Sequence, residues 1–189
     1  MNRWALSMGV SPREPLSNVA TLAAAAEAHG FEALWYIDFQ LGMKDVYAAM
    51  NVAAMATTAM HIGPSVTNLV TRHPTVTANA MAALDELTGG RAMLGIGAGW
   101  SAVYGAGGQP SKLRDISTGI DEIRQLFSGE EHDLYGARVQ LKTAQRQIPI
   151  YLAVSQPGML RMCGQKGDGA ILMGAADPQF CRWQLDHLY

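Results

Sequence analysis

The sequence has few of the features that mark metal-binding, secreted or nucleic-acid-binding proteins. Its two cysteines, Cys163 and Cys181, do not form a metal-ligand spacing, and we expect no metal site. Because no secretory signal precedes them, we expect both to be reduced thiols in the cytoplasm. Basic residues form no run and the formal net charge is −2, so the composition argues against a nucleic-acid partner.

Uninterrupted apolar stretches are also missing. Residues 46–71 carry no formal charge if His61 is neutral, but polar residues, glycine and proline interrupt them. This pattern favours a buried helix and strand over a membrane span. The short apolar stretch at the N-terminus is broken by Ser7 and Gly9, which is unlike a signal peptide. We therefore expect a cytoplasmic protein without a membrane partner.

The sequence does contain enough apolar material for one folded domain. Of its 189 residues, 49% are apolar and 16% are charged. Extended segments alternate with helical patterns, which predicts an α/β fold with a parallel sheet. Strands are expected to begin near Arg3, Ala33, His61, Arg91, Ile148 and Gly169. Helices are expected at Ser17–His29, Lys44–Met60, Pro74–Leu87, Lys112–Phe127 and Pro178–Tyr189.

The number of strand–helix units indicates a barrel that is not closed. The first four predicted strands begin about 29 residues apart, the length of one such unit. Residues 130–147 break this rhythm with a polar–apolar alternation around a glycine, which predicts a short inserted hairpin. Six units can be counted, whereas a closed TIM-type (β/α)8 barrel has eight strands and typically about 250 residues.

We therefore predict one incomplete TIM-type barrel domain over residues 1–189, with the last two units missing. An open doubly wound sheet is the alternative, and a strand order that reverses in the middle would indicate it. An unclosed sheet exposes two strand edges, so we expect a homodimer, a higher homo-oligomer or marginal stability.

Small and polar residues gather where two of the predicted strands end. Residues 61–99 read as strand, polar loop, helix and second strand, and the second strand ends in Gly95-x-Gly97-x-Gly99. In parallel α/β folds, ligands bind at the carboxyl ends of strands. Pro64 cannot donate a ladder hydrogen bond and so predicts a local distortion. The glycines allow a flat or phosphorylated ligand to approach the backbone closely.

Three other positions have both a structural and a functional interpretation. Asp38 follows an apolar strand and either caps the next loop or belongs to a site. Arg72 and His73 precede a helix, where Arg72 is either solvated or supports an anion and His73 is either structural or an acid. Asp85 and the adjacent glutamate are interpreted as capping or helix-surface charges.

Residues 61–99 closely resemble the corresponding part of the luciferase-like flavin and deazaflavin (F420) oxidoreductases, especially the methylenetetrahydromethanopterin-reductase branch. The resemblance runs from near residue 1 to Tyr189. It implies hydride transfer between a non-covalent cofactor and a small organic substrate at the mouth of the barrel. The implied cofactor is coenzyme F420, with FMN as the alternative.

The resemblance also implies a set of site residues. In that family the exit of the third strand holds a non-proline cis peptide bond that backs the flavin ring, which here is Ser65–Val66. An aspartate commonly meets the cofactor at the position of Asp38, which is the expected catalytic residue. The implied cofactor-binding residues are Asp38, Ser65, Val66, Thr67, Asn68, Gly97, Ala98, Gly99, Ser155, Gln156, Gly158 and Met159.

Two departures from the family pattern bear on the chemistry. Phe39 stands where the deazaflavin enzymes have histidine, and Trp100 stands where some relatives have a carboxylate base. Both argue against sugar-phosphate-dehydrogenase chemistry, and each either forms part of an apolar wall for the substrate or packs in the core. Two other functions stay open. One is reduced-FMN-dependent monooxygenation, which an apolar lining favours by excluding water. The other is a non-catalytic or vestigial flavin-binding role.

Overall fold

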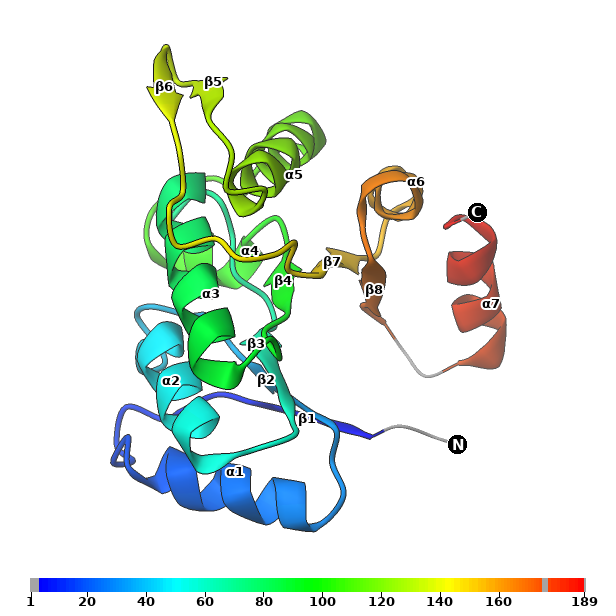
Figure 1. The fold of residues 1–189 in the computed structure, drawn as a ribbon. Coiled ribbons are helices and arrows are strands. Elements are labelled where there is room, and N and C mark those ends of the chain that lie inside the picture. Colours follow the sequence, from blue (N-terminus) through cyan, green and yellow to red (C-terminus); the bar gives the residue numbers. More distant parts are fainter. Residues whose placement is uncertain (1–3, 175–176, 189) are drawn as a thin grey trace.

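The chain folds into strands and helices that alternate over most of its length, and a computed structural model describes residues 4–174 and 177–188 (Figure 1). The strands are β1 Ala5–Met8, β2 Ala33–Tyr36, β3 His61–Pro64, β4 Leu94–Ile96, β5 His132–Leu134, β6 Ala137–Val139, β7 Ile150–Val154 and β8 Gly169–Leu172. The helices are α1 Asn18–Ala28, α2 Val46–Ala56, α3 Pro74–Thr88, α4 Trp100–Gly105, α5 Leu113–Phe127, α6 Pro157–Lys166 and α7 Pro178–Asp186.

The order of the parallel strands identifies the architecture. β1, β2 and β3 form one three-stranded sheet, and β4, β7 and β8 form another. Two isolated parallel bridges, Ile62–Ala92 and Thr67–Ile96, join β3 to β4. Neighbouring strands therefore follow one another in chain order, without the reversal that a doubly wound sheet would require. The barrel-type prediction is confirmed, and the doubly wound alternative is wrong.

The seam between β3 and β4 is distorted at the place that Pro64 predicted. No ladder pairs are found between the two bridges, and the backbones approach so closely that only glycine fits. A Cβ atom on Gly63 would lie 2.0 Å from the Met93 carbonyl oxygen, and one on Gly95 would lie 2.1 Å from that of Pro64. The glycines of these strands thus allow the irregular end of β3 to pack against β4.

Helices cover the outer face of the curved sheet (Figure 1). Around that face α1 packs on α2, α2 on α3, α3 on α5, and α5 on α6. In β7 the alternate residues Ile150, Leu152 and Val154 are buried, whereas Tyr151 and Ala153 are half-buried. On the half-buried face, Tyr151 meets Trp35 of β2 edge to face, with ring centroids 5.3 Å apart. The main core therefore lies between the sheet and its helices.

Most predicted helices begin and end within two residues of the observed limits, with α2 as the exception. This helix ends at Ala56, although the apolar pattern predicts helix to Met60. The Glu27 carboxylate at the end of α1 accepts backbone N–H groups of Thr58, Ala59 and Met60 at 3.0, 2.7 and 3.0 Å. These long-range bonds hold residues 57–60 as a turn. Helix α4 is an addition that the sequence pattern did not predict. The predicted strand start near Arg3 and helix end at Tyr189 lie outside the described residues.

The inserted hairpin is present as β5 and β6, which project at the top of Figure 1. The segment that follows runs along α3. Thr143 bonds to Asn79 at 3.2 Å, and Arg146 bonds to Asp85 near the end of the helix at 2.6 Å. Asp85 is buried and also accepts the N–H of Ala92. The prediction of a capping or surface role for Asp85 is therefore wrong, because its partner comes from a distant segment.

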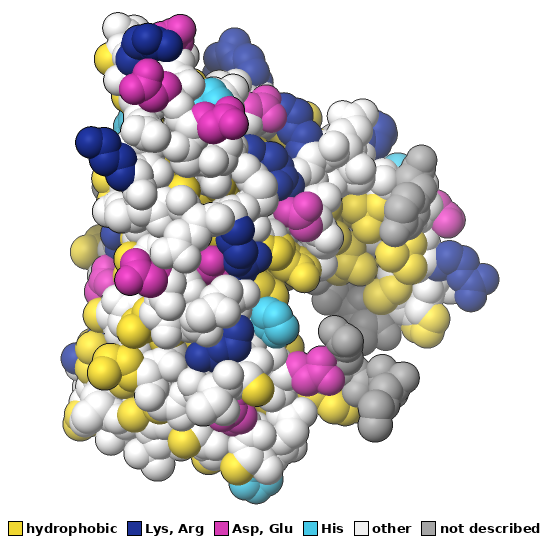
Figure 2. All heavy atoms as spheres, in the orientation of Figure 1, with side chains coloured by type: hydrophobic (Ala, Val, Ile, Leu, Met, Phe, Trp, Pro, Cys, Tyr) yellow, Lys and Arg dark blue, Asp and Glu magenta, His cyan; other side chains and the backbone are white. Residues whose placement is uncertain are grey.

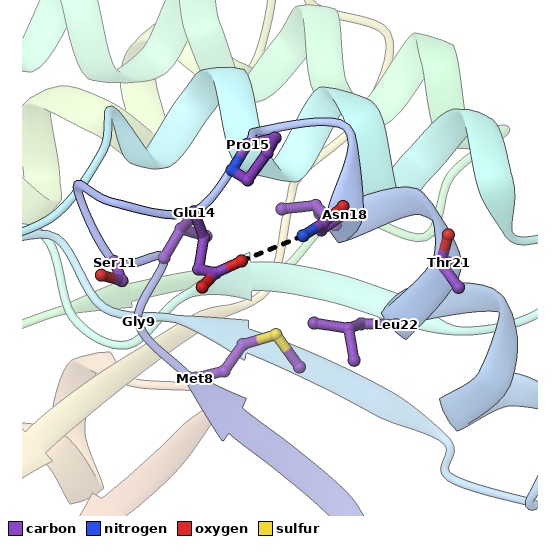
Figure 3. A pocket seen from close by; sticks show the side chains of 10 residues that line it. Met8, Gly9, Ser11, Glu14, Pro15, Asn18, Thr21 and Leu22 are labelled. Carbon is purple, nitrogen blue, oxygen red and sulfur yellow. Dashed lines mark hydrogen bonds between the residues drawn. The ribbon is translucent and has the colours of Figure 1, made fainter.

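The sheet has two outer strands, β1 and β8, each with a single strand neighbour among the described residues. A groove of about 420 Å³ lies between β1 and α1, with Met8 and Leu22 in its apolar lining (Figure 3). Glu14 accepts a hydrogen bond from Asn18 across its rim at 3.0 Å. At the other edge, hydrophobic side chains gather around β8 and α7, where Leu172 is exposed (Figure 2). Of the helices that the structure describes, none has the length and hydropathy to cross a bilayer.

Candidate active site at the carboxyl ends of the strands

The residues predicted for the site follow the carboxyl ends of four parallel strands. Asp38 and Phe39 follow β2, residues 65–68 follow β3, residues 97–100 follow β4, and residues 155–159 follow β7. Because these strands are parallel and adjacent, their ends lie along one edge of the sheet. The structure therefore brings all four predicted segments to the same side of the molecule.

Asp38 is the centre of a polar cluster. Its side chain is buried, and its Oδ2 atom accepts a hydrogen bond from the Thr67 hydroxyl at 2.7 Å. Its Oδ1 atom accepts one from the Gln40 amide at 2.7 Å. Asp38 thus joins the exits of β2 and β3 through Thr67 and holds Gln40 of the next loop. Both predicted interpretations stay open, because Oδ1 holds the Gln40 side chain of the next loop while Oδ2 joins a second strand end.

The environment of Asp38 favours its protonated form more than water does. Burial raises the pKa of Asp38 above its ordinary value, and this effect outweighs the hydrogen bond from Thr67 and the positive charge of Arg72. The negative charge of Asp45 raises the pKa further. A buried carboxyl group with a shifted pKa at a strand end is a candidate for a group that polarises a ligand or holds a proton.

Arg72 is part of the same cluster, a role that sequence reasoning missed. Its guanidinium Nη2 binds Asp45 at 2.7 Å, its Cζ lies 4.5 Å from the centre of the Tyr47 ring, and its Nε lies 3.9 Å from Asp38 Oδ2. The interpretation of Arg72 as a solvated side chain is therefore wrong, and its support of an anion stays a prediction. Asp45, directly before α2, was visible as a helix N-cap, but nothing local connected it to Arg72.

The exit of β3 has the backbone form that the resemblance implies. The Ser65–Val66 peptide bond is cis. After it, the Asn68 side-chain oxygen accepts the backbone N–H groups of Val70 and Thr71 at 3.0 and 2.9 Å, which shapes the loop before α3. The Asn68 Nδ2 atom is buried and has no hydrogen-bond partner. An amide donor without an acceptor suits a ligand that presents a carbonyl oxygen.

The glycines after β4 are explained by packing against this exit. A Cβ atom on Gly97 would lie 2.8 Å from Val66 Cγ2, and one on Gly99 would lie 2.8 Å from Asn68 Cβ. Gly99 also has a φ of 90°, in the left-handed region that glycine adopts without strain. This packing gives the glycines a structural role, and the close approach of a ligand stays a prediction. The glycines make room for residues 66–68, while Ala98 between them is half-buried and its carbonyl accepts the N–H of Ser111.

The two aromatic residues predicted to form a wall lie beside α4. Phe39 is half-buried against this helix, because a Cβ atom on Gly105 would lie 3.1 Å from its ring. Trp100, the first residue of α4, has 66% of its surface exposed, and its ring centroid is 5.9 Å from that of Tyr104. Trp100 is thus free to contact a ligand, whereas Phe39 also has a packing role.

The predicted cofactor-binding residues Ser155, Gln156, Gly158 and Met159 lie at the start of α6. Ser155 and Gln156 are exposed, and Gly158 and Met159 are half-buried. Gln156 occupies the N-cap position without capping the helix through its side chain. Backbone N–H groups at an uncapped helix start attract anions. The structure therefore keeps this segment available for a phosphate.

The remaining candidate, His73, is the N-cap residue of α3. Its Nδ1 accepts the N–H of Thr75 at 3.3 Å, and its ring lies 4.6 Å from that of Tyr135 in the inserted hairpin. These contacts support the structural interpretation of His73. Among residues 4–174 and 177–188, no three His, Cys, Asp or Glu side chains are grouped to hold a metal ion.

Comparisons with known proteins agree with this arrangement. A profile of the luciferase-like monooxygenase family matches residues 3–189. The chain is 34% identical over 177 residues to a 5,10-methylenetetrahydromethanopterin reductase from Methanolobus tindarius, covering 89% of this chain and 53% of the reductase. It is 31% identical over 173 residues to an F420-dependent glucose-6-phosphate dehydrogenase from Kineococcus radiotolerans, covering 81% of this chain and 51% of the dehydrogenase.

A solved structure shows the same fold. The coenzyme F420 dependent tetrahydromethanopterin reductase from Methanopyrus kandleri superposes with a TM-score of 0.82 at 24% identity, covering 98% of this chain and 59% of that one. The chain spans about half the length of the curated relatives it matches.

Proposed function

Because the chain belongs to the luciferase-like monooxygenase family, we propose that it holds the cofactor of an oxidoreductase that transfers a hydride between coenzyme F420 and a small organic substrate. The observation that supports this most is the buried pair of Asp38 and Thr67, which joins two strand ends beside the cis peptide bond. Similarity to an F420-dependent dehydrogenase and to methylenetetrahydromethanopterin reductases favours F420 over FMN.

The residues at this edge fit a flat ring with polar atoms on its rim. When bound, a deazaflavin or flavin ring supplies the hydride chemistry. The Ser65–Val66 backbone would support one face of the ring, and Asn68 Nδ2 would donate to an oxygen on its rim. Asp38 would polarise the ring or hold a proton beside it. The uncapped start of α6 would hold a phosphate of the cofactor tail through backbone N–H groups.

The substrate would meet a mainly apolar surface. Trp100 is largely exposed at the start of α4, and Phe39 lies against the same helix. Such a surface binds an organic substrate and excludes water from the ring. It also favours the second candidate function, monooxygenation with reduced FMN, which shares the ring site and differs in needing oxygen as co-substrate.

We also propose self-association as the way in which the open sheet edges are covered. β1 and β8 each leave one edge without a strand neighbour among the described residues, and such edges favour pairing with another chain. A second copy of the chain is the partner proposed here. A vestigial flavin-binding protein would share this assembly and lack turnover.

Titration with coenzyme F420 and with FMN, in parallel, tests the function. Quenching of cofactor fluorescence is followed for the unaltered chain, for Asp38→Asn and for Asp133→Asn. Asp133 is a matched control because it is a largely exposed aspartate in the hairpin. We expect saturable quenching by F420. Asp38→Asn should weaken the affinity for F420 about tenfold, because one charge-assisted hydrogen bond is lost. Asp133→Asn should leave the affinity unchanged.

Each other outcome has a clear meaning. Saturable quenching by FMN alone would replace F420 with FMN and favour the monooxygenase. Equal weakening by both aspartate variants would contradict the placement of the site at Asp38. Absence of quenching by either cofactor, in a sample with a cooperative unfolding transition, would contradict the proposal for this chain.

A further inference from the structure

Two side chains, Asp45 and Tyr47, hold the guanidinium group of Arg72 beside Asp38. Asp45 Oδ2 binds its Nη2 at 2.7 Å, and the Tyr47 ring lies under its Cζ at 4.5 Å. Asp45 is itself fixed, because its Oδ1 accepts the Ala48 N–H at 2.9 Å as the N-cap of α2. The first turn of α2 therefore determines where the guanidinium lies.

With the guanidinium held in this way, its Nε–H donor lies near Asp38. The Arg72 Nε atom is buried, has no hydrogen-bond partner among the residues that the structure describes, and lies 3.9 Å from Asp38 Oδ2. An unpartnered buried N–H group gains free energy from any small movement that brings it to an acceptor. The charged acceptor within 4 Å of this Nε is the carboxylate of Asp38.

The two oxygens of Asp38 consequently have different surroundings. Oδ2 accepts the hydroxyl hydrogen of fully buried Thr67 and faces the Arg72 charge. Oδ1 accepts only the amide of Gln40, which is exposed. A glutamine amide can turn and accept a hydrogen bond instead of donating one, whereas a guanidinium can only donate. Oδ1 is therefore the oxygen whose surroundings tolerate a proton.

We propose that Arg72 is a positioning residue for Asp38: anchored by Asp45 and Tyr47, it keeps Oδ2 as the unprotonated, accepting oxygen and directs the exchangeable proton to Oδ1, beside Gln40. In protonation, an O–H bond forms at Oδ1 with a proton from solvent, and the Gln40 amide turns to accept it. The use of that proton in hydride transfer rests on the proposed function. The placement of the proton does not.

The charged and titratable groups that face Asp38 from the surrounding elements are Arg72 before α3, and Asp45 and Tyr47 at the start of α2. Arg72 lowers the pKa of Asp38, while burial and the charge of Asp45 raise it. Removal of the Arg72 charge should therefore move the titration of Asp38 to higher pH. Removal of a distant charge should not.

The test is an NMR titration of the Asp38 carboxyl carbon in the cofactor-free chain, assigned by its loss in Asp38→Asn. We expect Arg72→Gln to raise the midpoint by about 1 pH unit, the effect of losing a close opposite charge. Arg72→Lys should raise it by less than half as much, because the charge stays while the Nε donor is lost. Arg114→Gln is the matched control, since Arg114 is largely exposed and pairs only with the adjacent Asp115.

Two resonances of the unaltered chain test the same proposal without a variant. The Arg72 Nε and Gln40 Nε2 signals should both shift at the midpoint of Asp38. An unshifted Asp38 midpoint in folded Arg72→Gln, or equal shifts in Arg72→Gln and Arg72→Lys, would overturn the proposal. If Arg72→Gln does not fold, a Gln40 Nε2 resonance of the unaltered chain that does not shift at the midpoint of Asp38 would overturn the proposal. Because no cofactor is present, failure of cofactor binding leaves this test valid.

Discussion

Single residues at the strand ends combine functional potential with a cost in stability, and Asp38 is the clearest case. The pKa of Asp38 is raised, so the folded chain binds its proton more readily than the unfolded chain does. Stability from this group is then present at low pH and falls as the pH rises through the folded pKa. An aspartate at a position where burial disfavours its charged form indicates a role other than stability.

We predict that Asp38→Asn is more stable than the unaltered chain at pH 7, because no buried charge has to form. The difference in the free energy of unfolding should disappear at pH 3, where Asp38 is protonated in both states. Urea unfolding at the two pH values measures it. A variant less stable at pH 7 would mean that the bonds from Thr67 and Gln40 outweigh the burial of the charge.

Gly97 has a packing requirement that a single methyl group violates. We predict that Gly97→Ala lowers the free energy of unfolding by about 1–3 kcal/mol, as overpacked core positions do, and abolishes cofactor quenching. Its Cβ would lie 2.8 Å from Val66 Cγ2 and displace the exit of β3. Gly136→Ala is the control. Its φ of 74° costs about 1–2 kcal/mol, but nothing lies within 4 Å, so quenching should persist.

At the level of the elements, the N-cap residue of α2, Asp45, makes two separate interactions. Asp45 caps the helix through Oδ1 and holds Arg72 through Oδ2. The pKa of Asp45 is lowered: burial raises it, but the Ala48 N–H and Arg72 together outweigh burial. Asp45 thereby connects the start of α2 to the loop before α3. The candidate site depends on both segments.

We predict that Asp45→Ala lowers the free energy of unfolding by about 1 kcal/mol through the lost cap. It should also broaden the Arg72 Nε signal, since the guanidinium loses its anchor. Asp45→Ser is the comparison, because serine restores the cap and not the ion pair. Recovery of stability without recovery of the Arg72 signal is the expected result, and recovery of both would mean that Tyr47 alone holds Arg72.

The turn between α2 and β3 depends on a carboxylate from α1. The pKa of Glu27 is lowered, because the N–H groups of Ala59, Met60 and Thr58 outweigh the opposing effect of burial. Stability from Glu27 is therefore present at neutral pH and is lost as the pH falls through the folded pKa. We predict that Glu27→Gln is less stable at pH 7 and equal to the unaltered chain at pH 2, measured by urea unfolding. Glu86→Gln serves as a control, because Glu86 is exposed on the surface of α3.

At the level of the whole molecule, the six parallel strands form a curved sheet that has two outer strands in the described residues. The helices bury one face, and the other face is only half-buried, as the pattern in β7 shows. The groove beside β1 adds exposed apolar surface at one of these edges. Exposed apolar area of this kind favours association, and this is the basis of the homo-oligomer proposed above.

We predict that sedimentation of the chain depends on concentration, and that Leu22→Glu weakens the association. Leu22 lines the groove beside β1 and is 54% exposed. Leu87→Glu is the control, because Leu87 is similarly exposed on α3, away from both edges. A concentration-independent monomer would contradict the proposed homo-oligomer. Equal effects of both variants would place the contact elsewhere.

Short-range patterns were sufficient for the elements and for the edge of the sheet where chemistry is expected. Strand starts at Ala33, His61 and Gly169 agree with the sequence pattern, because alternation of burial and turn residues is a local property. The distortion at Pro64 followed from a missing N–H group. The family resemblance added the cis bond at Ser65–Val66, which no local pattern specifies.

Short-range patterns could not predict hydrogen bonds between residues that lie far apart in the chain. The bond of Asp85 to Arg146 spans 61 residues, that of Asp45 to Arg72 spans 27, and that of Glu27 to Ala59 spans 32. Charge and helix position predicted a surface role for Asp85 and a solvated Arg72, because a sequence shows which residues are charged but not what they meet. Only the packing of α2, α3 and the strand ends against one another decides that.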